Sequence, residues 1–164
     1  MKQRKMSKKS SRTFTGIKLG THESVAALRN ALQARGIRVG KWGNDILDQV
    51  TVSPTETQVD LVVVTPADLY FKDGATRIGI YERAVALGLD LCPSEVGPQL
   101  RLQYVDQPQD EWLCIAMEPI LDSDGYRGVF RLGHERGELW LDGNFGNPHN
   151  FWHSFYSWVF LRCK

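Results

Sequence analysis

The stretch LCPSEVGPQLRLQY (91–104) decides how this chain folds, because it separates a helix-rich half from a strand-rich half. Two prolines and a glycine surround Glu95, and from residue 98 leucines alternate with polar residues. Such alternation is typical of a strand with one buried face, so PQLRLQY (98–104) is predicted to be a strand. Glu95 then lies in the turn before it. We expect its carboxylate to accept backbone N–H groups of that turn or to pair with Arg101.

Four later segments are also strand-like, and turn sequences such as DQPQD and DSDG separate most of them. They are EWLCIAM (111–117), GVFRL (128–132), ELWLD (138–142) and SWVFLRC (157–163). With residues 98–104 they predict an antiparallel C-terminal sheet of about five strands.

The first half mixes helices and strands. FTGIKL (14–19) has strand character, and VDLVVV (59–64) is typical of a strand buried on both faces. KWGNDIL (41–47) is expected to open as a loop and to end in a helical turn. Two helices are predicted, at 21–35 with Thr21 as its cap, and at 76–87. Their inner stripes are Val25, Leu28 and Leu32 in the first helix, and Ile78, Tyr81, Ala84 and Val85 in the second. The fold class is therefore α+β, with N-terminal helices and one buried strand beside the antiparallel sheet.

The charge is distributed unevenly along the 164 residues. Residues 1–12 carry six of the 20 Lys and Arg residues and no acidic residue, although the net charge of the whole chain is only +1. Such a segment cannot bury apolar area, so residues 1–12 are expected to form a disordered basic tail and residues 13–164 a single domain. A tail of this charge, from Lys2 to Arg12, can contact nucleic acid weakly.

Cysteine use and hydropathy point to a cytoplasmic protein that does not enter a membrane. The three cysteines, Cys92, Cys114 and Cys163, form no CxxC pair, which argues against a disulfide framework or a zinc ribbon. No apolar run approaches the length of a membrane span. The histidines of HNFWH (149–153) are four residues apart, but the preceding Asn147-Pro148 favours a loop. We therefore expect neither a metal nor a cofactor.

Strand parity divides the predicted sheet into two faces. One face collects aliphatic side chains and is the expected core layer: Leu100, Leu102, Leu113, Ile115, Leu139, Leu141, Val159 and Leu161. The opposite face mixes indole rings, guanidinium groups and polar side chains, which suits stacking on a sugar, a nucleobase or a peptide. With Glu95, its candidate ligand-binding residues are Arg101, Gln103, Trp112, Trp140, Asp142, Trp158 and Arg162. Tryptophan is also a large core residue, so a helix covering this face would use the same side chains.

Three functions are compatible with these patterns. The first is a small soluble binding or accessory module that takes an unknown small molecule, a sugar or a protein on the aromatic and arginine face. The second is a small hydrolase, of nuclease or glycosidase type, in which Glu95 works with a histidine. The third is a nucleic-acid-associated protein that binds through its basic tail. No Walker motif, GxGxxG or GxSxG sequence selects among them.

Several strings together resemble a group of small uncharacterised bacterial proteins with no assigned activity. They are KDGATR (72–77), LCPSEVGPQLRLQY (91–104), DQPQDEW (106–112), AMEPILDSDG (116–125) and LWL (139–141). The resemblance extends over about residues 37 to 164 and leaves out the basic tail. It implies a bacterial and cytoplasmic protein, and it implies no activity, cofactor or site residue.

Overall fold

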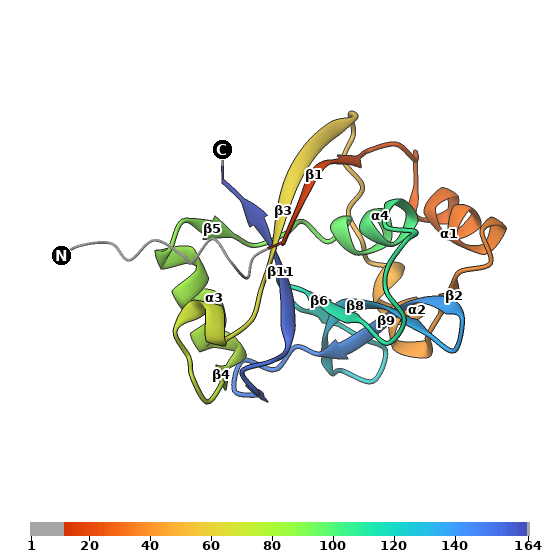
Figure 1. The fold of residues 1–164 in the computed structure, drawn as a ribbon. Helices are drawn as coiled ribbons and strands as arrows, with labels where there is room; N and C mark the ends of the chain where they lie inside the picture. Colours follow the sequence, from red (N-terminus) through yellow and green to blue (C-terminus); the bar gives the residue numbers. More distant parts are fainter. Residues whose placement is uncertain (1–11, 164) are drawn as a thin grey trace.

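A computed structural model describes residues 12–163, which form one α+β domain (Figure 1). Its centre is a nine-stranded sheet that is mostly antiparallel. The sheet is thus larger than the five C-terminal strands expected from the sequence, because the N-terminal strand β3 pairs with the C-terminal strand β11 and β1 pairs in turn with β3. Arg12 is the first residue of the sheet, whereas residues 1–11 of the predicted tail lie outside the described residues.

The sheet follows the order β1-β3-β11-β6-β8-β9-β2, with β5 beside β11 and β7 beside β8. The strands are β1 (Arg12–Leu19), β2 (Arg38–Val39), β3 (Thr57–Val64), β5 (Leu89–Asp90), β6 (Trp112–Ile115), β7 (Ile120–Leu121), β8 (Arg127–Glu135), β9 (Glu138–Phe145) and β11 (Ser157–Arg162). Only the pairs β11–β6 and β2–β9 are parallel. A separate two-stranded sheet joins β4 (Ala75–Thr76) to β10 (Phe151–Trp152).

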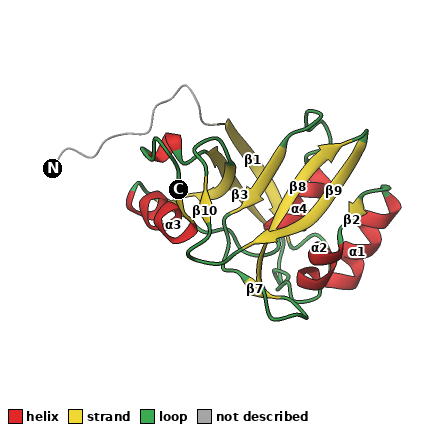
Figure 2. Cartoon of the chain, turned by 90° about the horizontal axis from the view of Figure 1, so that it is seen from below, coloured by secondary structure: helices red, strands yellow, loops and turns green. Residues whose placement is uncertain are grey.

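Helices lie on both sides of the central strands β3 and β11. Helix α3 (Arg77–Ala86) lies on one side, and α1 (Val25–Ala34), α2 (Lys41–Leu47) and α4 (Val96–Gln103) lie on the other (Figures 1 and 2). Helix α2 packs on the neighbouring strands β8 and β9. A short 3-10 turn, Ala67–Leu69, follows β3. No helix within residues 12–163 combines the length and the apolar character that crossing a membrane requires.

The buried strand and both predicted helices are confirmed, with changes at their ends and faces. Leu61 to Val64 of β3 are all buried. The cap of α1 is Ser24 rather than Thr21, since the Ser24 hydroxyl accepts the N–H of Ala27. In α3, Tyr81 and Ala84 face the core as expected. Ile78 and Val85 are exposed instead, because Ile80 takes the inward position.

The predicted strand at 98–104 is wrong: these residues belong to helix α4 and its C-terminal cap. Pro98 is tolerated there because it lies in the first helical turn, where its missing N–H would have no partner. All residues from Val96 to Leu102 are buried. A helix surrounded by protein shows no single apolar stripe, so the alternation of leucine with polar residues imitated a strand.

Helix α2 departs in part from the expectation, since all of residues 41–47 are helical rather than only a turn at the end of the segment. Its glycine allows the helix to lie directly on strand β9. A Cβ atom added to Gly43 would come within 2.7 Å of the Cα atom of Asp142. The Gly43 N–H also donates to the Asp142 carboxylate at 3.2 Å. This close approach is a tertiary contact that the local sequence does not reveal.

Helix α4 packs equally closely on strand β8, which gives a test of the corrected assignment. A Cβ atom at Gly97 would lie 2.4 Å from Cδ2 of the buried Phe130 ring. We expect Gly97→Ala to lower the free energy of unfolding by about 1–3 kcal/mol, because the ring must move within a packed core. The measurement is urea denaturation. Gly79→Ala in α3 is the matched control, since its Cβ would meet Thr76 Oγ1 at 3.2 Å and the Ala75 Cβ atom at 3.8 Å, and no buried ring. Equal stabilities of the two variants would contradict this packing.

Candidate functional site

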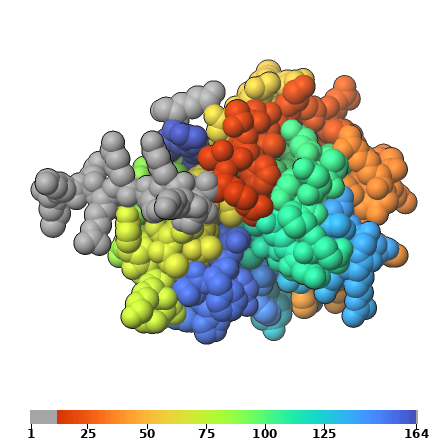
Figure 3. All heavy atoms as spheres, viewed as in Figure 1, coloured from red at the N-terminus to blue at the C-terminus, as the bar shows by residue number. Residues whose placement is uncertain are grey.

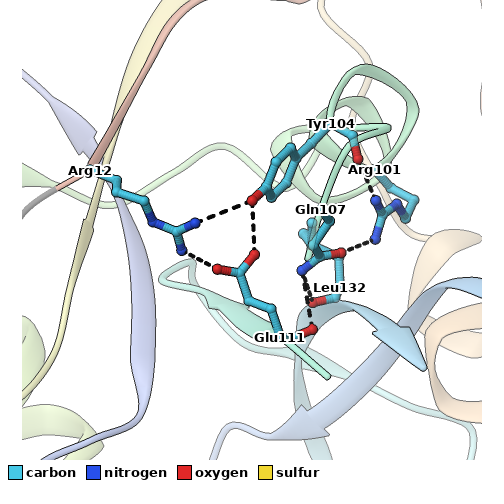
Figure 4. A network of polar contacts seen from close by, with 6 residues as sticks. All are labelled: Arg12, Arg101, Tyr104, Gln107, Glu111 and Leu132. Carbon is cyan, nitrogen blue, oxygen red and sulfur yellow. Dashed lines mark hydrogen bonds and ion pairs between the residues drawn. The ribbon is translucent and has the colours of Figure 1, made fainter. Parts of the chain in front are cut away.

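Arg101 is a buried anchor rather than a surface clamp. Its guanidinium donates to the Gln107 side-chain oxygen at 2.6 Å and to the Tyr104 carbonyl oxygen (Figure 4). It also donates to the carbonyl oxygens of Gly133 at 3.0 Å and Trp140 at 3.4 Å. No carboxylate within residues 12–163 forms an ion pair with it, and burial lowers the pKa of Arg101 to about 10. The side chain therefore joins α4, the following loop, β8 and β9.

Glu95 is a second buried anchor, and it does not contact Arg101. Its carboxylate accepts the backbone N–H groups of Gly20 and Ser53, both at 2.7 Å, and the Gln99 amide at 2.9 Å. The expected acceptor role is correct, but the donors come from two distant loops rather than from its own turn. A cavity of about 820 Å³ lies beside Glu95, and none of its lining residues is a histidine. The partner that the hydrolase hypothesis requires is thus absent from this cavity.

Gln103 and the loop after α4 hold the first strand in place. The Gln103 side chain exchanges two hydrogen bonds with the backbone of Lys18, both at 2.9 Å. Tyr104 donates to Glu111 at 2.9 Å, and the same carboxylate forms an ion pair with Arg12 (Figure 4). In Figure 3 the red atoms of β1 lie against the green atoms of α4 and this loop. Gln103 is therefore exposed but already committed to a structural contact.

The predicted aromatic face is present on strands β6, β8 and β9. Trp112, Arg131 and Asp142 of these strands are in contact with one another, and we call them the aromatic stack. Cross-strand pairing aligns Trp112 with Gly133 and Trp140, and it aligns Arg131 with Asp142. The Trp112 ring occupies the space that a Gly133 Cβ would take, 2.3 Å away. The Arg131 guanidinium lies 4.3 Å from the centre of that ring, and it forms an ion pair with Asp142 at 3.6 Å. This geometry fixes the direction in which Arg131 points.

The other predicted residues do not join this stack. Trp158 is fully buried, and its ring meets those of Tyr81 on α3 at 5.7 Å and Trp152 at 4.8 Å. Helix α3 therefore covers this end of the face, which the sequence had left open as an alternative. Arg162 is exposed and pairs with Leu89 of β5. Glu95, Arg101 and Gln103 leave the face altogether, because α4 is a helix.

The aliphatic face agrees with the parity prediction where the strands were assigned correctly. Its fully buried members are Leu113, Ile115, Leu141 and Val159. Leu100 and Leu102 are also buried, but on helix α4 rather than in a strand. At these two positions the predicted burial is confirmed, although the predicted secondary structure is wrong.

A surface cavity of about 440 Å³ lies where the aromatic stack meets helix α2, and we call it the β9 groove. Trp42 and Phe145 are 49% and 60% exposed, and their ring centres are 6.4 Å apart with planes inclined at 44°. Arg131 reaches the groove from the stack. The groove is also lined by Lys41, Tyr126, Arg127, Asn144, Asp122 and Asp124.

The charges of the β9 groove are not equally available. The Asp122 carboxylate accepts the backbone N–H groups of Asp124 at 2.9 Å and Tyr126 at 2.8 Å, so it holds its own turn together. By contrast, neither Lys41 nor Arg127 belongs to any ion pair in the described part of the chain. The Asp124 carboxylate likewise belongs to no ion pair in that part of the chain. The groove therefore presents two unpaired cations and one unpaired carboxylate, together with the ion-paired Arg131, beside a pair of exposed rings.

Sequence reasoning missed most of this groove, although two signals were present. WGND (42–45) carries an exposed indole at the start of α2, and DSDG (122–125) forms the turn opposite. Arg131 lies in the predicted strand 128–132 on the same parity as the tryptophans. Nothing in the sequence places these three segments together, because α2 meets β9 through tertiary contacts such as the close approach at Gly43 and the hydrogen bond from the Gly40 N–H to the Leu141 carbonyl.

Two of the three thiols are unsuited to nucleophilic chemistry. Cys92 and Cys114 are buried, and burial raises the pKa of the Cys114 thiol to about 12 and that of Cys92 further still. A raised pKa leaves almost no thiolate at neutral pH. Among residues 12–163, no group of three or more His, Cys, Asp or Glu residues is arranged to hold a metal ion.

The comparisons with known proteins give no further guide. No protein-family model, no curated protein and no solved structure matches this chain. The resemblance to small bacterial proteins therefore stays a prediction.

Thiol reactivity checks the burial of the cysteines. At pH 8, a thiol reagent is expected to modify Cys163 of the folded protein rapidly, because Cys163 is exposed. Cys92 and Cys114 should react at least about a hundredfold more slowly, since both the burial and the raised pKa of each thiol suppress the thiolate. Mass spectrometry after digestion assigns each modification. All three should react in denaturant, and equal rates in the folded state would disprove the arrangement.

Substitution of Arg101 tests its role as an anchor. Arg101→Met should lower the free energy of unfolding by about 2–4 kcal/mol, because it leaves several buried acceptors without a donor. Arg101→Lys should recover only part of this loss, since an ammonium group lacks the planar fork that reaches four oxygens. Arg162→Met is the control, as Arg162 is exposed. The reading fails if Arg101→Met and Arg162→Met prove equally stable in chemical denaturation.

Proposed function

We infer that this protein is a small binding module and that the β9 groove takes a nucleotide. The observation that carries this proposal is the exposed pair of rings, Trp42 and Phe145, next to the cations Lys41, Arg127 and Arg131. A planar base gains free energy by covering aromatic surface, and a phosphate gains it from nearby cations. Both kinds of group stand within one cavity of about 440 Å³, which lies in the range of small-ligand pockets.

The aromatic stack supports this function by positioning Arg131. Trp112 packs against the guanidinium, and Asp142 forms an ion pair with it. Asp142 also accepts the Gly43 N–H, so it links the stack to the helix that carries Trp42. A cation held on two sides loses little conformational entropy when it binds an anion. Trp112 and Asp142 of the predicted face thus act as supports of the groove, and Arg131, which the sequence prediction did not include, contacts the ligand.

A neutral sugar is the nearest alternative ligand, since sugars also stack on aromatic rings. Unpaired Lys41 and Arg127 favour an anion over a neutral ligand, because a phosphate would gain charge-assisted hydrogen bonds that a hydroxyl group cannot provide. The hydrolase hypothesis ranks lower, because both Glu95 oxygens are occupied and no histidine lines the adjacent cavity. Nucleic-acid contact through Lys2 to Arg12 concerns residues that, apart from Arg12, lie outside the described part.

The test is isothermal titration of the full chain with a nucleoside 5′-monophosphate, the matching nucleoside and a neutral disaccharide. We expect the monophosphate to bind most tightly. Trp42→Ala should weaken it about tenfold through lost stacking, and Arg131→Ala by a similar factor through a lost charged hydrogen bond. Phe155→Ala is the matched control, because Phe155 is 71% exposed and does not line the groove.

Each alternative outcome is distinct. Binding of the disaccharide instead of the monophosphate would replace the proposed ligand with a sugar. Equal binding of nucleoside and monophosphate would remove the phosphate from the proposal. A monophosphate that binds equally well to Trp42→Ala and to the unmodified protein would show that the groove is not the site.

A further inference from the structure

The β9 groove continues into a second cavity, which extends the site beyond one nucleotide. This cavity has a volume of about 650 Å³, and it shares Tyr126, Arg127 and Phe145 with the first. Its far end is lined by Asn147, His149 and Asn150, in the loop before β10. Because three residues line both cavities, a ligand can pass from one to the other without leaving the surface.

The second cavity shares two rings and one cation with the first, and it adds two amides and an imidazole. Tyr126 and Phe145 are 65% and 60% exposed, so each offers ring surface at the junction. Arg127 stands at the same junction and has no ion-pair partner in the described part of the chain. Beyond it the lining residues include amides and an imidazole but no carboxylate. The groove thus becomes less acidic in the direction away from Asp122 and Asp124.

This alternation of rings and cations matches a repeating ligand. A polynucleotide presents planar bases at regular intervals with one negative charge between neighbours. A first base over Trp42 and Phe145 would place the following phosphodiester near Arg127, and the next base against Tyr126. The amides of Asn147 and Asn150 and the ring of His149 can exchange hydrogen bonds with the edge of that second base. A mononucleotide would leave the second cavity empty.

We propose that the β9 groove and its continuation bind single-stranded nucleic acid across at least two consecutive nucleotides. This inference rests on the proposed nucleotide function and deepens it, since it names the class of nucleotide ligand. A duplex would not serve, because its bases are stacked on one another and cannot reach the rings. RNA and DNA share the required chemistry.

The experiment compares a mononucleotide, a dinucleotide and a labelled single-stranded hexanucleotide, each as RNA and as DNA, by competition in fluorescence anisotropy with the full chain. The dinucleotide is expected to bind about tenfold more tightly than the mononucleotide, because one more base stacks. The double variant His149→Ala/Asn150→Ala should weaken dinucleotide binding severalfold, because the edge of the second base loses its hydrogen bonds while its stacking on Tyr126 remains. It should leave mononucleotide affinity unchanged. A difference between the RNA and DNA arms shows whether a 2′-hydroxyl contributes.

The controls separate this inference from the function beneath it. Trp42→Ala should weaken all three ligands, whereas Phe155→Ala should weaken none, and thermal melting confirms that each variant is folded. If the mononucleotide binds but the dinucleotide is no tighter, the second cavity is not a subsite and the inference is overturned alone. If no nucleotide binds, the proposed function is overturned with it. Tight hexanucleotide binding that is unaffected by the double variant would assign the extra affinity to residues outside the groove and also overturn the inference.

Discussion

The buried guanidinium of Arg101 is the interaction on which the arrangement of this fold depends. It has no carboxylate partner among residues 12–163, and it is held only by amide oxygens on the loop after α4, on β8 and on β9. Carbonyl dipoles compensate a desolvated charge only when they are closely oriented, so the cost of disorder around Arg101 is high. The register of α4 relative to β8 and β9 is therefore tightly specified.

Glu95 acts in the same way at the other end of α4. Its two oxygens accept backbone N–H groups from loops at Gly20 and Ser53, which lie after β1 and before β3. One short helix thus carries a buried anion and a buried cation that do not pair with each other. Each connects a different set of strands to the helix. This division explains why a segment of only eight residues can organise both halves of the sheet.

The groove is built on the strand that Arg101 holds in place. The Trp140 carbonyl on β9 accepts a hydrogen bond from Arg101. Two residues further along the same strand, Asp142 forms an ion pair with Arg131 and accepts the N–H of Gly43 on α2. Asn144 and Phe145 continue the same strand into the groove. A rigid strand therefore positions the cation, the helix that carries Trp42, and the second ring. Positioning of this kind lowers the entropy that a binding site loses when a ligand is bound.

Local pattern alone determined the α+β class, the buried strand β3, the helices α1 and α3, and the parity of the C-terminal strands. In each of these elements, residues are buried at a regular spacing on one face or on both. This spacing is visible in the local sequence, so the element can be predicted without knowledge of its neighbours. Tertiary structure alone decided that residues 96–103 form a helix, that α3 covers Trp158, and that Trp42 stands beside Phe145. The leucines of α4 showed no helical period, because all residues from Val96 to Leu102 are buried. The sequence did not place the groove, because its walls come from segments that meet only after folding.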